Sequence, residues 1–237
     1  NNPTVREAAL EAGVAVRALV DEAIAAARAD PSDADTIVKR LLAAQQTAQD
    51  ELSDVVIRSI LIGMITGFVP TNTMAAGNTL EMLLRRPDFM AQARDAARSG
   101  DDARLKRCLF EAFRFKPLNP GPFRVVAEDY VVGEGTRRAK RIPKGTQLMV
   151  CTQSAMFDPR RIERPNRFDP ERRPSNYLLF GHGLHWCVGA PLAEAQITQT
   201  LKPLLLKRNL RRAPGPAGRL QKSGPFPAHL VVEWDPD

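Results

Sequence analysis

The sequence predicts a mainly α-helical fold with a small antiparallel β part. Two observations predict this class. Apolar residues recur at helical spacing through most of residues 4–115, whereas residues 117–169 combine prolines and glycines with short β-branched runs. A chain of 237 residues with 43% hydrophobic content can bury a sizeable core, in one large domain or two small ones.

Five helices are expected in the first half of the chain. A break at Asp30-Pro31-Ser32-Asp33 separates the first two. Ser53 is a plausible N-cap for the third, long central helix, which should end before Pro87. The predicted helices cover residues 4–29, a stretch ending at 46, about 53–86, about 87–99 and about 101–115.

The central helix contains Pro70 near its middle. A proline there removes one backbone donor, and its ring clashes with the preceding turn, so we expect a kink or a widened turn near Thr66 to Thr71. The longest apolar run, Ile57 to Val69, is interrupted by Arg58 and other small or polar residues. Because it is too short to cross a bilayer with confidence, no membrane span is expected.

Short strands are expected in the β-rich part, residues 117–169. Runs of β-branched residues indicate strands at 125–126, 130–132 and 147–150, and Ile142-Pro143-Lys144-Gly145 indicates a turn. The elements expected after residue 169 are an irregular stretch, a glycine-rich loop at 180–189, a helix over about 190–207 and a last strand over 228–234.

Charge and cysteine content narrow the function classes. The 34 Lys plus Arg and 27 Asp plus Glu give a net charge of +7 spread along the chain, which favours an acidic protein partner. No zinc-finger spacing or RNA-recognition signature supports a nucleic-acid partner. The three cysteines lie far apart without CxxC pairs, which indicates a reducing cytoplasm. No basic-then-apolar signal segment opens the sequence.

Residues 180–189, FGHGLHWCVG, hold the largest concentration of candidate functional residues in the sequence. Cys187 stands just before a predicted helix, whose N-terminal partial positive charge lowers the pKa of a thiol. Gly183 and Gly189 leave room for backbone N–H groups to approach the sulfur. Two other interpretations are an inert buried cysteine and a zinc site that includes the two neighbouring histidines, for which no fourth ligand is evident.

This segment resembles the cysteine loop of the cytochrome P-450 superfamily, FGxGxHxCxG, at every fixed position. The resemblance implies a haem-thiolate protein that binds haem b (iron protoporphyrin IX), with Cys187 as the metal ligand. A thiolate donates electron density to haem iron and favours O–O cleavage. Phe180 would pack on the proximal side, and Arg124 and His185 occupy positions whose side chains reach haem propionates. The implied cofactor-binding residues are Cys187, Phe180, Gly181, Gly183, His185, Gly189 and Arg124.

Other segments of the superfamily occur upstream in the expected order. Glu111-Ala112-Phe113-Arg114 matches the family's ExxR, and its one-turn spacing puts both charges on one face of a helix. In the family this pair meets a third arginine, which the segment Pro170-Glu171-Arg172 resembles. The resemblance therefore implies a structural role for Glu111, Arg114 and Arg172. It covers residues 1–237 as the C-terminal, haem-binding part of one cytochrome P-450-like domain.

The chain departs from the family in lacking the N-terminal half. Its opening Asn1-Asn2-Pro3 has no initiator methionine, so we expect a processed chain or a fragment. The missing half would be supplied by another polypeptide or by a fused domain. A further departure lies in the central helix, where the family places an acid before a threonine; here Pro70 replaces the acid and Thr71 is kept.

The resemblance places residues of the central helix on the distal side of the haem. Proline cannot perform the proton transfer assigned to the acid. Thr71 and Gly67, which leaves space for an oxygen ligand, are the implied catalytic residues. A mostly apolar pocket wall for a small organic substrate is expected at Phe68, Val69, Leu118 and Asn119.

Three functions agree with these features. The first is a haem-thiolate monooxygenase that oxidises an organic substrate with electrons from a ferredoxin or a flavoprotein. The second is a hydroperoxide isomerase, dehydratase or peroxygenase, which needs no proton relay and is favoured by Pro70. The third is a non-catalytic haem-binding module, because fold-level resemblance does not fix function.

Overall fold

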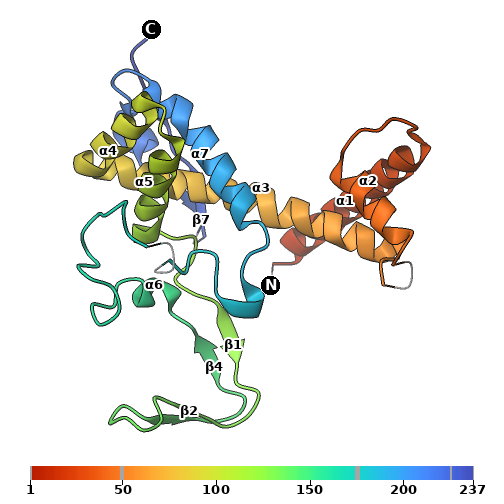
Figure 1. Cartoon of the computed structure of the whole chain (residues 1–237), viewed down its shortest axis with the longest axis horizontal. Coiled ribbons are helices and arrows are strands. Elements are labelled where there is room, and N and C mark those ends of the chain that lie inside the picture. Colours follow the sequence, from red (N-terminus) through yellow and green to blue (C-terminus); the bar gives the residue numbers. More distant parts are fainter. Residues whose placement is uncertain (1, 49–50, 174–176, 225, 237) are drawn as a thin grey trace. The chain divides into compact units, whose positions relative to one another are not determined.

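The computed structural model describes residues 2–48, 51–173, 177–224 and 226–236. It divides into two compact units, Asn1–Pro70 and Thr71–Asp237, and the boundary falls inside the long helix α3 (Asp54–Arg85). Helices dominate both units, and short antiparallel strand pairs occur in the second (Figure 1). This arrangement confirms the predicted fold class.

The first unit holds α1 (Pro3–Ala29), α2 (Ile37–Gln45) and the beginning of α3. The start of α1 is fixed locally, because the Asn2 side chain accepts a hydrogen bond from the Thr4 N–H and Pro3 occupies the first turn. A small core of Val20, Ile24 and Ile57 joins α1 to α3. Both predicted helices before residue 47 are therefore confirmed.

Helix α3 runs without interruption through Pro70. Every residue from Asp54 to Arg85 is α-helical, so the widened turn expected near Thr66 to Thr71 is absent. A proline removes one hydrogen-bond donor, and the helical bonds on both sides keep the segment in the α conformation. The predicted range of the helix is confirmed to within one residue at each end.

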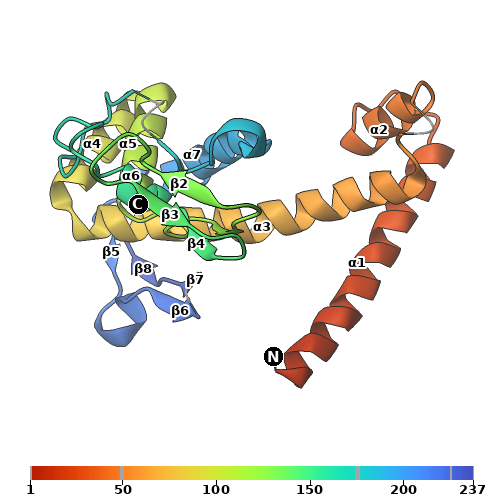
Figure 2. The same ribbon diagram turned by 90° about the horizontal axis from the view of Figure 1, so that it is seen from below.

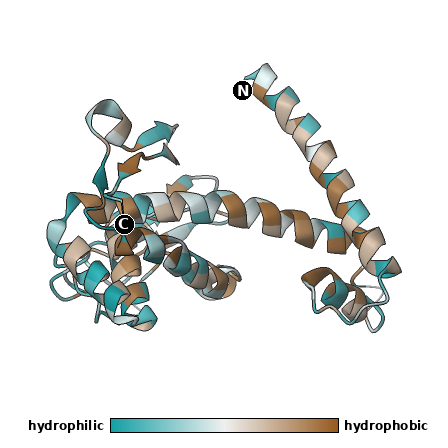
Figure 3. Ribbon diagram, turned by 90° about the horizontal axis from the view of Figure 1, so that it is seen from above, coloured by the Kyte–Doolittle hydropathy of each residue, from teal (hydrophilic) through white to brown (hydrophobic). Residues whose placement is uncertain are grey.

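By length and composition alone, α3 is long and apolar enough to cross a membrane (Figure 3). The expectation of no membrane span considered only Ile57 to Val69, and it stays a prediction. The C-terminal part of α3 nevertheless belongs to a protein core, because Asn78, Thr79 and Glu81 are buried there. The Glu81 carboxylate is paired with two arginine side chains of the second unit, as a buried charge requires.

The core of the second unit lies among α4 (Pro87–Ser99), α5 (Asp102–Phe115) and α7 (Ala190–Leu206), which contact one another pairwise. Helix α4 ends at Gly100, whose left-handed conformation suits glycine. Asp101 then caps α5 by accepting a hydrogen bond from the Arg104 N–H. The three predicted helices are confirmed, and α5 carries the ExxR segment into the core.

Four strands follow α5, and they pair in an antiparallel manner: β1 (Phe123–Val125) with β4 (Gln147–Met149), and β2 (Tyr130–Val132) with β3 (Lys140–Ile142). The strand predicted at 130–132 and the turn between β3 and β4 are confirmed, the strand predicted at 147–150 ends one residue earlier, and the one predicted at 125–126 instead ends at Val125. The β-rich part is shorter than expected, since after β4 the described residues up to 182 hold only the short helix α6 (Thr152–Ala155) and irregular chain.

The C-terminal strand prediction over 228–234 is wrong in detail. Two strands lie there, β7 (Phe226–His229) and β8 (Val232–Glu233), and they pair with β6 (Gln221–Ser223) and β5 (Arg211–Arg212) in separate two-stranded sheets. Figure 2 shows these four strands grouped together, apart from β1 to β4. The partner strands are two and three residues long, too short for a periodic sequence signal.

Candidate haem-thiolate site

Residues 180–189 form a closed loop on the approach to α7. The Cys187 N–H donates to the Phe180 carbonyl at 2.8 Å, and the Trp186 N–H donates to the Gly183 carbonyl at 3.0 Å. Gly181 has a φ of +82°, and a Cβ there would lie 3.2 Å from the His185 carbonyl oxygen, so glycine suits this position. Backbone bonds and glycine geometry therefore fix where the Cys187 thiol sits.

Cys187 presents an exposed free thiol at the N-terminal end of α7. Its carbonyl accepts a hydrogen bond from the Ala190 N–H, and Gly189 occupies the N-cap position. A Cβ added to Gly189 would lie 3.8 Å from the Cys187 sulfur, so glycine keeps the space beside the sulfur open. An exposed thiol beside the start of a helix is accessible to a metal ion, so the donor fits a haem-iron ligand.

The surroundings of the thiol also fit a large apolar cofactor. Leu184 and Val188 are 97% and 95% exposed, and Trp186 is half exposed. Large apolar side chains gathered in one exposed loop mark a surface for an apolar ligand or partner. Phe180 is half-buried and packs against Phe110 of α5, with ring centroids 5.8 Å apart, so it ties the loop to the core.

Neither of the other two cysteines occupies a comparable position. Cys108 is fully buried in α5, and burial raises the pKa of its thiol to about 11. Cys151 is exposed at the start of α6, without a glycine-rich loop. Among the described residues, no group of three or more His, Cys, Asp or Glu side chains could hold a metal ion, so the zinc interpretation lacks a ligand set.

The remaining residues predicted near the haem lie on separate elements. Arg124 is exposed on β1 and its guanidinium donates to the Phe123 carbonyl at 2.8 Å. His185 is exposed in the 3₁₀ turn η2 (Gly183–His185). Leu118 packs partly against the core, and Asn119 is exposed. Their roles toward the cofactor and the substrate stay predictions.

The distal residues lie on α3, on both sides of the boundary between the two units. Gly67, Phe68 and Val69 belong to the first unit, and Thr71 begins the second. Their predicted roles over the haem therefore stay predictions as well.

Glu111, Arg114 and Arg172 meet in the core of the second unit. Glu111 and Arg114 are fully buried, and Arg114 donates to both carboxylate oxygens at 2.7 and 2.8 Å. The Arg172 Nε lies 3.4 Å from Glu111 Oε1. A two-point arginine–carboxylate contact is among the strongest polar contacts in proteins. The structure thus brings the three predicted structural residues together.

The remaining donors of Arg114 bind backbone carbonyls, which offsets the cost of burying its charge. They reach the carbonyl of Met156 at 2.9 Å and that of Pro165 at 2.8 Å. The guanidinium also lies 4.6 and 4.4 Å from the ring centroids of Phe115 and Phe157. Arg114 therefore holds the irregular segment after β4 against α5.

Sequence reasoning missed two further donors to the Glu111 carboxylate. The Tyr177 hydroxyl donates to Glu111 Oε2 at 2.8 Å, and the Asp169 N–H donates to Oε1 at 3.1 Å. Burial, reinforced by the Glu111 charge, raises the pKa of the Tyr177 phenol, which stays protonated and able to donate. Asp169 lies in Phe168-Asp169-Pro170, which resembles the family's segment before the cysteine loop, but no motif marks Tyr177, three residues before that loop.

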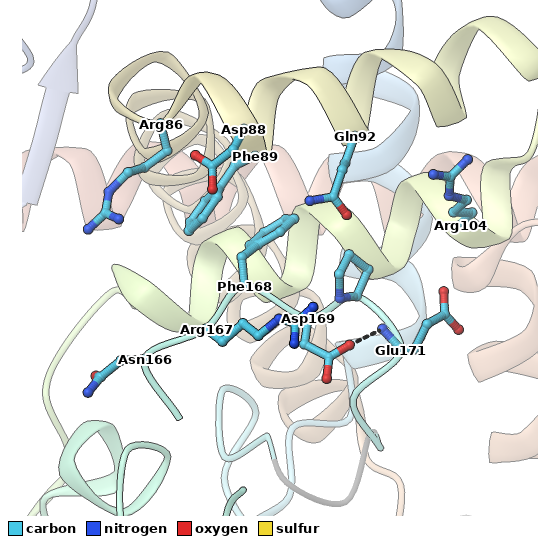
Figure 4. Close-up of a pocket in the computed structure, with 11 residues that line it drawn as sticks. Arg86, Asp88, Phe89, Gln92, Arg104, Asn166, Arg167, Phe168, Asp169 and Glu171 are labelled. Atoms are coloured by element: carbon cyan, nitrogen blue, oxygen red, sulfur yellow. Dashed lines mark hydrogen bonds between the residues drawn. The ribbon is translucent and has the colours of Figure 1, made fainter. Parts of the chain in front are cut away.

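A separate surface crevice of about 500 Å³ lies beside this cluster (Figure 4). Its floor includes the stacked rings of Phe89 and Phe168, whose centroids are 3.9 Å apart. Charged side chains of both signs also line it: Arg86, Asp88, Arg104, Arg167, Asp169 and Glu171. None of the predicted cofactor or substrate residues lines it, so it is not the predicted haem pocket.

Comparison with known proteins agrees with this site. The cytochrome P-450 family model matches residues 4–217. The chain therefore belongs to the cytochrome P-450 family, and this family implies a haem cofactor. The loop at residues 180–189 and the cluster around Glu111 lie inside the matched range.

Individual relatives illustrate the range of the family. The mycinamicin IV hydroxylase/epoxidase of Micromonospora griseorubida is 28% identical over 89% of this chain and 48% of that protein. The bifunctional dioxygenase (DOX)-epoxy alcohol synthase (EAS) of Pyricularia oryzae is 32% identical over 48% of this chain and 10% of that protein. The crystal structure of CalO2 is similar with a TM-score of 0.81 and 24% identity, over 100% of this chain and 57% of that chain.

The chain spans about half the length of the curated relatives it matches, and the fold it shares with the solved structure corresponds to a partial cytochrome P-450 fold.

Proposed function

We propose that this chain is the haem b-binding part of a cytochrome P-450 monooxygenase that oxidises a small organic substrate. The observation that carries the proposal is the exposed Cys187 thiol in a closed glycine loop at the start of α7. When bound, haem ligated by a thiolate supplies oxygen activation, because the thiolate favours O–O cleavage. Relatives named as hydroxylases or epoxidases support this class.

The residues of this chain would have the following roles in the proposed enzyme. Cys187 binds the iron, and Arg124 and His185 bind the propionate carboxylates through charge-assisted hydrogen bonds. Gly181, Gly183 and Gly189 keep the loop closed and the sulfur accessible. Phe68, Val69 and Leu118, with Asn119, line a mostly apolar substrate pocket. Gly67 leaves space on the distal side, where the Thr71 hydroxyl relays a proton.

The partners of the proposed enzyme follow from its charge and length. A basic surface suits an acidic electron donor such as a ferredoxin or a flavoprotein. The rest of the substrate pocket would come from residues equivalent to the part of the relatives that this sequence does not match. The spacing of the three cysteines, all free in the structure, suits a cytoplasmic location.

Carbon monoxide binding to the reduced chain tests the cofactor assignment. We expect haem reconstituted into the purified chain to give a far-red-shifted Soret band in the reduced, carbon monoxide-bound state. A band at the position typical of nitrogen-ligated haem would contradict the proposal. Haem binding with this band, but without turnover under either oxygen source, would leave a non-catalytic haem module instead.

A peroxide-using enzyme is the second candidate, and Pro70 favours it. Proline cannot supply the proton transfer that the family's acid performs at this position. A relative named as a dioxygenase–epoxy alcohol synthase matches part of this chain, which supports the same candidate. Such an enzyme receives oxygen already at the peroxide level and needs no external electron donor.

Replacing Thr71 with alanine separates the two candidates. If the enzyme uses dioxygen, we expect T71A to lower the rate with dioxygen and reductant by roughly 10²-fold, because one positioned proton donor is lost. The rate with an organic hydroperoxide should change less than about threefold. Thr66→Ala, on the same helix, serves as the matched control, since its hydroxyl binds the Ile62 carbonyl. Faster turnover with hydroperoxide than with dioxygen in the unmodified chain would favour the second candidate.

A further inference from the structure

We propose that Tyr177 is a positioning residue for the cysteine loop, holding its first residues to the Glu111 carboxylate so that Cys187 is correctly placed. The inference rests on the proposed haem-thiolate function and deepens it. It concerns the protein's own hydrogen bonds, which can also be tested without cofactor.

Tyr177 contacts the buried Glu111 carboxylate directly. Glu111 Oε2 accepts hydrogen bonds from Arg114 Nε and from the Tyr177 hydroxyl, both at 2.8 Å. Arg114 lies on the same helix as Glu111, whereas Tyr177 is 66 residues away in sequence. The phenol is therefore the donor that connects this buried carboxylate to the chain just before the loop.

Hydrogen bonds link the residue after Tyr177 to the backbone of Cys187. The next residue, Leu178, donates its N–H to the Met156 sulfur at 3.2 Å and accepts a hydrogen bond from the Gly181 N–H at 3.2 Å. Phe180 then accepts the hydrogen bond from the Cys187 N–H. Two backbone hydrogen bonds therefore connect the residue after Tyr177 to the Cys187 backbone, and a shift of Tyr177 reaches the cysteine through them.

Loss of the Tyr177 hydroxyl should affect the position of the loop more than the stability of the core. Met156 is itself held by Arg114 through its carbonyl, so α5 restrains the loop through the Met156 sulfur and the Tyr177 hydroxyl, in addition to the packing of Phe180 against Phe110. Tyr177→Phe removes one hydrogen bond and keeps the aromatic ring. The contacts of Glu111 with Arg114 and Arg172 remain, so the core should persist while the loop loosens.

Amide hydrogen exchange of the cofactor-free chain is the first test. In Y177F we expect the amides of Trp186 and Cys187, both hydrogen-bonded within the loop, to exchange roughly tenfold faster, as for the loss of a hydrogen bond to a charged group. The amides of α5 should be unchanged. Y130F, which alters an exposed tyrosine on β2, is the matched control. Unchanged loop exchange, or equal acceleration in α5, would overturn the inference.

The alkaline titration of the phenol checks the buried contact. The chain has two tyrosines, so Y130F leaves Tyr177 alone. Because the folded pKa of Tyr177 is raised above its ordinary value of 10.0, its contribution to stability is complete below pH 10 and declines as the pH rises further. We expect no phenolate absorbance near pH 10 while the chain stays folded. Ionisation near pH 10 in the folded chain would show that the contact is absent.

The haem-bound spectrum tests the consequence for ligation. If the unmodified chain gives the far-red-shifted Soret band, we expect Y177F to show a mixture of this band and one without thiolate ligation. A purely structural role would instead lower the amount of folded protein and leave a single thiolate band, which would overturn the inference. If the unmodified chain gives no such band, the proposed function fails, and hydrogen exchange alone decides on Tyr177.

Discussion

Cys187→Ala will abolish the far-red-shifted Soret band of the reduced, carbon monoxide-bound chain. Alanine has no donor atom, and neither of the other two cysteines can replace the thiolate, because Cys108 is fully buried and Cys151 stands at the start of α6. We expect the band to disappear completely and haem retention to fall at least tenfold after gel filtration. The absorption spectrum of the reconstituted variant measures both effects.

The matched control is Cys151→Ala, which removes the other exposed thiol. We expect this variant to keep the unmodified spectrum, since its thiol stands outside the glycine loop. A far-red-shifted band in C187A, or its loss in C151A, would place the ligand elsewhere. Circular dichroism should confirm that both variants keep the helical content of the unmodified chain.

Glu111→Ala should cost about 3–5 kcal/mol in free energy of unfolding, the usual effect of leaving one member of a buried ion pair without its partner. Arg114 is fully buried and Arg172 nearly so, and the Tyr177 hydroxyl and the Asp169 N–H would lose the same acceptor. Urea unfolding followed by circular dichroism gives the value. Where the variant does not fold at all, the loss exceeds the measurable range in the same direction.

Two further variants test whether the loss of stability in E111A arises because the charges are buried. Glu194→Ala removes a carboxylate that pairs with Lys106 on a partly exposed surface, and we expect a loss below about 1 kcal/mol. The double variant Glu111→Leu with Arg114→Met removes both buried charges and should unfold less readily than E111A alone. A double variant that is less stable than E111A would contradict the charge argument.

Local patterns predicted much of the helical fold and the cysteine loop. The loop was identified by its resemblance to the cytochrome P-450 cysteine loop, and its glycine with positive φ and its cysteine just before a helix agree with that resemblance. The range of the helix through Pro70 was predicted correctly, but the widened turn expected there was wrong, because the rule for proline describes a lost bond and not the flanking bonds that keep the helix intact.

The sequence by itself determined the mainly helical class, the Cys187 loop and the one-turn spacing of Glu111 and Arg114. These features depend on residues within one or two turns of each other. Only the tertiary structure decided which other groups meet the Glu111 carboxylate, since Asp169 and Tyr177 are 58 and 66 residues away. A buried charge must be satisfied by donors from whichever segments pack around it, and that choice is made by packing rather than by sequence spacing.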